Sequence, residues 1–83
     1  MIQLLYFARL REALNMDGEA LPLTEAISVS ALMASLAARG GAWQEQFDGT
    51  RPLRAAINQE LVANTALIQP GDEVAFFPPV TGG

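Results

Sequence analysis

Residues 70–83 read Pro-Gly-Asp-Glu-Val-Ala-Phe-Phe-Pro-Pro-Val-Thr-Gly-Gly, and this order of turn, strand and tail sets the architecture that we expect. Pro70-Gly71 is a turn signature, because proline suits the first central position of a β-turn and glycine the second. The next five residues, Glu73 to Phe77, read as a largely apolar strand. Pro78-Pro79 then removes two backbone N–H donors and ends sheet pairing. We therefore predict a last strand over residues 73–77 with a tail directly after it.

The six residues from Pro78 to Gly83 suit an extended arm. At about 3.3–3.6 Å per residue, they can reach roughly 20 Å beyond the folded body. Glycine has no Cβ, so Gly82 and Gly83 leave the terminal carboxylate bare enough to enter a narrow channel. A frayed chain end is the competing interpretation, but the two prolines and the lack of other reactive groups favour a functional tail. We divide the chain into a body, residues 1–77, and a tail, residues 78–83.

The side chains that the chain lacks exclude most forms of catalysis. It has no cysteine, no histidine and no lysine, and its five basic residues are all arginines. A Cys/His zinc site, a cysteine nucleophile, a histidine base and a Schiff-base lysine are therefore impossible. Its nine carboxylates follow no metal-binding spacing such as that of an EF-hand. We expect no metal or cofactor on this chain, and a carrier, modifier or binding module in place of a self-sufficient enzyme.

Length and composition predict one small folded domain with a protein partner. Eighty-three residues with 51% hydrophobic content provide a core, although a domain this small buries only about 60–65% of its unfolded surface. The net charge of −4 disfavours nucleic acid, which requires a basic patch. The apolar stretch over residues 2–8 is too short for a membrane span and lacks a basic leader. We expect a cytoplasmic protein, since a chain without cysteine needs no oxidising compartment.

One main helix is predicted in the middle of the chain. Ser28 is a favourable N-cap, and Gly40-Gly41 stops the helix, which we place over residues 28–39. Apolar side chains recur after the cap at helical spacing and form a stripe that faces the core: Val29, Leu32, Met33 and Leu36.

Short strands and turns account for the rest of the body. We predict strands over residues 2–7, 19–23, 53–57, 60–62 and 73–77, a short helix over 8–14, a helical turn over 43–47 and a turn at Asn58-Gln59. One main helix cannot cover both faces of a sheet. The prediction is an α+β fold whose first and last strands pair in the middle of a mixed sheet. One face of the sheet stays open, and the tail leaves from one end of the central strand.

This order and this tail together resemble the β-grasp, ubiquitin-like sulfur carriers, and among them the family of small subunits of molybdopterin synthase. The resemblance covers essentially the whole chain, and its most specific motif is the run over residues 71–83. Two further motifs carry it, Tyr-Phe-Ala-Arg-Leu-Arg-Glu over residues 6–12 and Ile-Asn-Gln over residues 57–59. The thiamine-pathway carriers share the fold and the diglycine, but they lack the short helix after the first strand and the Phe-Phe-Pro-Pro lead-in.

The resemblance implies a sulfur carrier in molybdenum cofactor biosynthesis. An ATP-dependent activating enzyme resembling those of ubiquitin would adenylate the carboxylate of Gly83, and a sulfur donor would convert the acyl-adenylate to a thiocarboxylate. The tail, with Gly82 and Gly83 at its end, would enter the large subunit of the synthase. There it would give sulfur to a cyclic pyranopterin phosphate, and two deliveries would build the dithiolene. The acid–base residues would belong to the partner, and two copies of each chain would assemble around a dimer of the large subunit.

Strand alternation assigns side chains to the two faces of the sheet. The polar Gln3 marks the open face, which places Phe7 on it, and Phe77 points the same way from the last strand. Leu61 joins them if its register allows. Exposed aromatic residues are common in protein contacts, so we predict an apolar patch (Phe7, Leu61 and Phe77) that binds the partner, unless a loop of this chain covers it.

The resemblance adds further contacts to this surface. It implies that Arg11 lies beside the apolar patch and pairs with partner acids. It also implies that four tail residues contact the large subunit: Pro78, Pro79, Val80 and Thr81.

Three other functions fit the same residues. A thiamine-pathway sulfur carrier would use the same fold and the same terminal diglycine. A ubiquitin-like protein modifier uses the same activation but ends in an isopeptide bond to a target lysine. A non-covalent interaction module would use the apolar patch alone, without chemistry at the tail.

Overall fold

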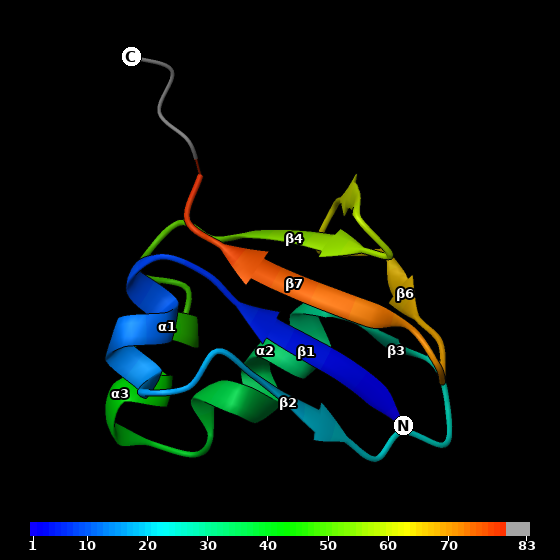
Figure 1. Cartoon of the computed structure of the whole chain (residues 1–83), viewed down its shortest axis with the longest axis horizontal. Coiled ribbons are helices and arrows are strands. Elements are labelled where there is room, and N and C mark those ends of the chain that lie inside the picture. Colours follow the sequence, from blue (N-terminus) through cyan, green and yellow to red (C-terminus); the bar gives the residue numbers. More distant parts are fainter. Residues whose placement is uncertain (80–83) are drawn as a thin grey trace.

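The structure is a computed structural model that describes residues 1–79 of the 83-residue chain (Figure 1). The first half of the chain forms β1 (Ile2–Tyr6), α1 (Arg9–Leu14), β2 (Gly18–Leu21), β3 (Ile27–Ser28) and α2 (Val29–Ala37). The second half forms α3 (Gly41–Phe47), β4 (Arg54–Ile57), β5 (Glu60–Val62), β6 (Leu67–Ile68) and β7 (Glu73–Phe77).

The main sheet has five strands in the order β2-β1-β7-β4-β5. Strands β1 and β7 run parallel, with Leu4 opposite Val74 and Tyr6 opposite Phe76. The other neighbouring strands are antiparallel. The predicted mixed sheet, with the first and last strands adjacent and the last strand in the middle, is confirmed.

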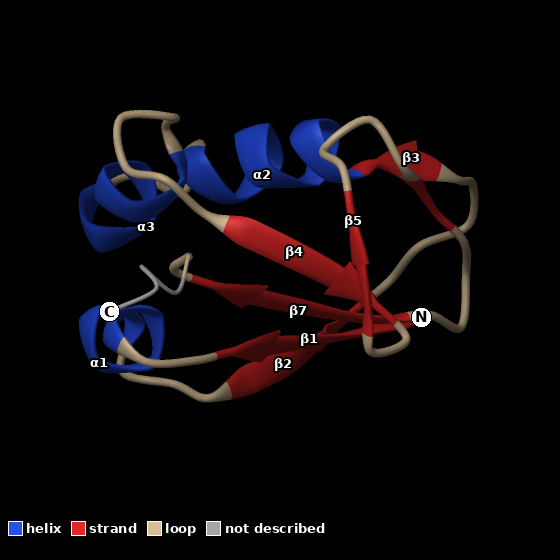
Figure 2. Ribbon diagram, turned by 90° about the horizontal axis from the view of Figure 1, so that it is seen from above, coloured by secondary structure: helices blue, strands red, loops and turns tan. Residues whose placement is uncertain are grey.

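The helices pack on one face of this sheet. Figure 1 shows α2 passing behind the strands, and Figure 2 shows α2 and α3 on one side of the sheet. Alternate side chains of β1 and β7 point into this layer and meet the stripe of α2, and the buried contacts include Leu4, Tyr6, Val74, Phe76, Val29, Leu32 and Leu36. Met33, the remaining member of the predicted stripe, is only half-buried. The predicted core face of the helix is thus largely confirmed.

Local chemistry explains where α2 begins and where the chain turns. The Ser28 hydroxyl accepts a hydrogen bond from the Ala31 amide at 3.0 Å, which caps the helix as predicted. Before β7, the Asp72 amide donates to the Gln69 carbonyl at 3.1 Å, and Gly71 has φ 93°, a conformation that favours glycine.

The hairpin between β4 and β5 turns at Asn58 and Gln59, which have φ 51° and 72°. Positive φ at both central residues matches the right-handed twist of the strands. The Asn58 side chain donates to Asp72 at 3.1 Å and accepts from the Glu73 amide at 3.0 Å. This predicted turn therefore also holds the start of β7.

Several features differ from the sequence prediction. The strands predicted over residues 19–23 and 53–57 occupy 18–21 and 54–57, and the helical turn predicted over 43–47 is a helix over 41–47. A separate two-stranded sheet pairs β3 with β6, with Ile27 opposite Ile68; strands of two residues are too short to produce an alternating pattern. The main helix ends at Ala37, two residues before the predicted end at Arg39, because a turn intervenes before Gly40. Within residues 1–79, no helix combines the length and apolar character that crossing a bilayer requires.

The buried stripe of α2 makes a direct test of this packing. Leu36 is 1% exposed and Leu32 is 3% exposed, so Leu36→Ala or Leu32→Ala is expected to lower the free energy of unfolding by about 2–5 kcal/mol. Ser35→Ala, on the exposed side of the same helix, is the control and should change it by less than about 0.5 kcal/mol. Chemical denaturation measures all three, and a midpoint that neither leucine substitution moves would contradict the assigned core.

Candidate functional site

The face of the sheet opposite α2 carries the apolar patch predicted from the sequence. Residues directly opposite each other in a ladder share a face. Ala56 pairs with both Ala75 and Leu61, so Leu61 lies on the same face as Ala75. This pairing settles the register of Leu61, whose side chain is 67% exposed.

Phe7 and Phe77 lie next to each other at one end of this face. The Phe7 amide donates to the Phe76 carbonyl at 3.2 Å, which extends the β1–β7 ladder by one residue beyond Tyr6 and Phe76. Phe7 is 45% exposed and Phe77 is half-buried. No described segment covers Phe7, so the alternative of a covering loop is wrong for that residue. Leu61 lies apart from this pair, on the edge strand beyond β4.

The tail begins beside the two phenylalanines. Strand β7 ends at Phe77, and Pro78 and Pro79 follow it, both half-buried. Arg11 is exposed on α1, at the same end of the sheet as the end of β7 (Figure 1). The other predicted tail contacts, Val80, Thr81, Gly82 and Gly83, lie outside the described residues, and their roles stay predictions.

Arg54 belongs to this surface, although the sequence analysis did not single it out. It is exposed and pairs with Phe77 across the β4–β7 ladder, next to the start of the tail. Its alternation with the buried Ala55 in the predicted strand was the signal that could have placed it on the open face.

A polar and aromatic cluster on the opposite face holds the edge of the sheet in place. The Tyr6 hydroxyl donates to Glu19 at 2.9 Å, and the Arg39 guanidinium donates to both oxygens of Glu19 at 2.9 and 3.0 Å. Arg39 also lies 4.3 Å from the centroid of the Trp43 ring, within the range of a cation–π contact. These contacts join β1, β2 and α3 to Arg39, two residues after the end of α2.

The same contacts change the pKa values of the three ionisable groups. The hydrogen bonds from Arg39 hold the pKa of Glu19 below its usual range, and they raise the pKa of Arg39 in turn. Burial raises the pKa of Tyr6, and its hydrogen bond to Glu19 adds to the increase. Each residue is therefore held in its ordinary neutral or charged form near pH 7, which makes the cluster structural and not an acid–base pair.

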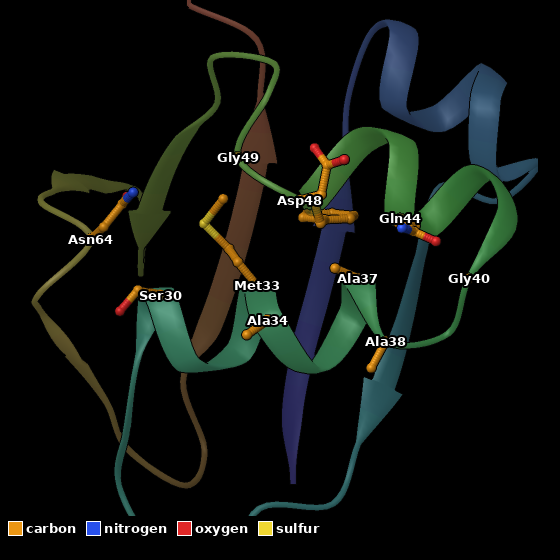
Figure 3. Close-up of a pocket in the computed structure, with 11 residues that line it drawn as sticks. Ser30, Met33, Ala34, Ala37, Ala38, Gly40, Gln44, Asp48, Gly49 and Asn64 are labelled. Carbon is orange, nitrogen blue, oxygen red and sulfur yellow. The ribbon is translucent and has the colours of Figure 1, made fainter.

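A groove of about 660 Å³ lies on the helix side of the molecule, away from the apolar patch. Figure 3 shows Met33 and Ala37 of α2 and Asp48 at the end of α3 around it. Asp48 is the one ionisable side chain among the lining residues, and hydrogen bonds from the Thr50 side chain and amide lower its pKa. A lone exposed carboxylate has no partner for acid–base work. Among the described residues, no cluster of three or more metal-ligating side chains occurs.

The described side chains therefore place Phe7, Phe77 and Arg54 at the start of the tail, and the described clusters contain neither an acid–base pair nor a metal site. The sequence comparison agrees with this arrangement, since the ThiS family matches residues 4–83. The chain belongs to the ThiS family. The resemblance to ubiquitin-like sulfur carriers that the sequence indicated is confirmed.

Individual relatives of this ThiS-family chain carry more specific descriptions. The molybdopterin synthase sulfur carrier subunit of Escherichia coli strain K12 is 41% identical over 83 residues, which is all of both chains. Among solved structures, small archaeal modifier protein SAMP1 of Haloferax volcanii has a TM-score of 0.77 and 25% identity, covering 99% of this chain and 98% of that one.

A third neighbour is part of an assembly. It is described as a complex of subunits 1 and 2 of the molybdopterin-converting factor of Helicobacter pylori, with a TM-score of 0.66. At 19% identity, over 99% of this chain and 97% of that one, it bears on the fold alone.

The cluster around Glu19 predicts a pH-dependent contribution to stability. The pKa of Glu19 is lower in the folded chain than its unfolded value of about 4.3. Its stabilising effect is thus fully present above the unfolded pKa and is lost as the pH falls through the lowered folded pKa. Glu19→Gln is expected to reduce the free energy of unfolding at pH 7 by about 1 kcal/mol, a deficit that shrinks as the pH falls below the unfolded pKa of about 4.3.

Denaturation at several pH values measures this difference. Glu45→Gln, at an exposed position of α3, is the control and should change the free energy of unfolding by less than about 0.5 kcal/mol at pH 7. A deficit of Glu19→Gln that is the same at every pH would mean that the charge of Glu19 contributes nothing.

Proposed function

We propose that this chain is the sulfur carrier subunit of a molybdopterin synthase and is not an enzyme on its own. The observation that carries the proposal is the position of β7. It is the central strand, paired on both edges, and it ends at Phe77 beside the exposed Phe7. A partner that covers this face therefore receives whatever group the tail carries. The full-length relative named as a sulfur carrier subunit supports the same function.

The chemistry takes place at the carboxylate of Gly83. An activating enzyme joins this carboxylate to the α-phosphorus of ATP, and pyrophosphate leaves. A sulfur donor then displaces AMP from the acyl-adenylate, which leaves a thiocarboxylate on the chain. In the synthase, the sulfur moves to the pyranopterin substrate, and hydrolysis returns the carboxylate. ATP binds to the activating enzyme, so this chain itself holds no cofactor.

The composition of the chain protects the activated tail. An acyl-adenylate reacts with amines and thiols, and this sequence contains no lysine and no cysteine. Side chains of the carrier cannot form an amide or a thioester with its own activated carboxylate. The absence of cysteine also suits the reducing cytoplasm, where we place the protein.

We propose the large subunit of the synthase as the partner of the open face. The apolar patch supplies two aromatic residues and Leu61, a composition typical of binding hot spots, and Arg11 and Arg54 add positive charge near the tail. The full-length relative of Escherichia coli, which is named as a subunit of molybdopterin synthase, supports an assembly of this kind. Two copies of each chain would assemble around a dimer of the large subunit.

A ubiquitin-like protein modifier is the second candidate, which the likeness to SAMP1 supports. The intact mass of protein isolated from its native host distinguishes the two functions. Exchange of one oxygen for sulfur at the C-terminus supports the carrier. An isopeptide bond to the lysine of another protein supports the modifier.

The apolar patch can be tested by its effect on assembly. Phe7→Ala and Phe77→Ala are each expected to weaken binding to the large subunit by at least about tenfold, because truncation of a hot-spot residue costs about 2 kcal/mol or more and each 1.4 kcal/mol is about tenfold in affinity. Calorimetric titration measures the affinity. The fold should tolerate the change at Phe7, which is 45% exposed. If both variants bind like the wild type, the partner uses another surface.

The tail can be tested separately from docking. Deletion of Gly83 moves the terminal carboxylate back by about 3.5 Å, and a misplacement of about 1 Å can cost about a hundredfold in rate. We expect deletion, or one added residue, to abolish sulfur transfer while folding is unchanged and docking is weakened less. Gly82→Val is expected to be nearly as damaging, because a β-branched side chain must then enter a channel shaped for bare backbone. If the deletion variant still forms the dithiolene with purified partners, Gly83 takes no part in the chemistry. The non-covalent interaction module would then be the remaining function.

A further inference from the structure

We propose that Arg9 is a positioning residue that fixes the direction in which the tail leaves the sheet. The inference rests on the proposed function, because it concerns how the tail reaches the partner. Arg9 donates one hydrogen bond from Nε to Gln46 Oε1 at 3.2 Å and another from Nη2 to the Pro52 carbonyl at 3.2 Å.

The hydrogen bond to Pro52 joins the segments on either side of the end of β7. Arg9 lies three residues after the end of β1, and Pro52 lies two residues before the start of β4. Strands β1 and β4 are the two neighbours of β7. Arg9 therefore connects the chain on one side of Phe77 to the chain on the other side, at the point where the tail begins.

Gln46 anchors this connection to the body of the protein. It belongs to α3 and is the one buried polar side chain among residues 1–79, with 5% exposure. A buried side-chain oxygen needs a hydrogen-bond donor, and Arg9 supplies it. In both ribbon views, α1 and α3 lie at the end of the sheet where β7 ends (Figures 1 and 2). The guanidinium is thus held by a side chain that has little room to move.

The backbone at Ala8 is what directs Arg9 to this place. In a continuing strand, residues 7 and 9 would share a face, yet Phe7 extends the ladder as an exposed residue while Arg9 reaches the buried Gln46. Ala8 makes the change of direction with φ 55° and ψ −130°, a conformation that is costly for any residue with a Cβ. The strained conformation of Ala8 thus places Phe7 on the proposed docking face and directs Arg9 to the other side of the sheet, where it acts as a positioning residue.

The consequence for the tail follows from geometry. Proline fixes φ at Pro78 and Pro79, so the direction set at Phe77 is kept over these two residues. A small change in spacing between the two flanking segments would change the direction in which Pro78 and Pro79 leave the sheet. Loss of Arg9 should therefore slow sulfur transfer more than it weakens docking.

The test uses the full chain carrying a thiocarboxylate, the large subunit and the cyclic pyranopterin phosphate. For Arg9→Ala and Gln46→Met, we expect the single-turnover rate of sulfur transfer to fall by about tenfold or more. The affinity for the large subunit should change by less than about twofold. Gln46→Glu keeps an acceptor for Arg9, so its rate of sulfur transfer should be close to that of the wild type. Arg51→Ala removes the same charge from an exposed position in the loop that leads to Pro52, and it should transfer sulfur like the wild type.

Two results would overturn the proposal. One is a wild-type transfer rate for Arg9→Ala. The other is an equal loss of rate and affinity, which would make Arg9 a docking residue. If the wild-type chain itself transfers no sulfur, the proposed function fails. The role of Arg9 is then tested by amide hydrogen exchange. Exchange at Phe7, whose amide bonds to Phe76, should be faster in Arg9→Ala than in Arg51→Ala, and equal exchange would also overturn the proposal.

Discussion

The parallel pairing of β1 with β7 is the contact on which the rest of the structure depends. It places the last strand in the middle of the sheet, with buried pairs Leu4–Val74 and Tyr6–Phe76 at the centre of the core. Parallel neighbours need a long connection, and the chain between these two strands supplies every other element. The helices can cover only one face of the resulting sheet, so the same pairing determines which face remains open.

In this arrangement, the side chains that stabilise the fold and the group proposed to react belong to different parts of the chain. A typical enzyme surrounds its reactive atoms with a pocket built by its own side chains. Here the described side chains build the body and the proposed docking face, and the proposed chemistry resides at the end of the main chain. The central strand supports that end better than an edge strand would, because hydrogen bonds hold β7 on both sides up to Phe77. Positioning then depends on what flanks the end of the strand, which is where Arg9 lies.

Local signals in the sequence were enough to predict the elements that depend on neighbouring residues. The bounds of β7 follow from Pro70-Gly71 before it and Pro78-Pro79 after it, and the cap of α2 follows from Ser28. The open face follows from alternation along β1 and β7, which correctly separated Phe7 and Phe77 from Val74 and Phe76.

Contacts between distant residues left no such signal. The pairing of β3 with β6 joins residues 41 positions apart, Ile27 and Ile68. Glu19 meets Arg39, and Arg9 meets Gln46, because the fold brings their elements together. The register of Leu61 likewise depended on a ladder that only the folded sheet defines. The strand order and the open face were thus predictable from local patterns, but the long-range contacts of Glu19 and Arg9 were not.

The central position of β7 also determines how the molecule responds to tension. A partner that draws the tail into a channel pulls along the axis of β7. The hydrogen bonds to β1 and β4 lie across that axis, so the pull loads both ladders in shear, and many bonds must give way together. An edge strand pulled away from its sheet would instead lose its hydrogen bonds one at a time. The body is therefore expected to keep its central strand when the tail is pulled.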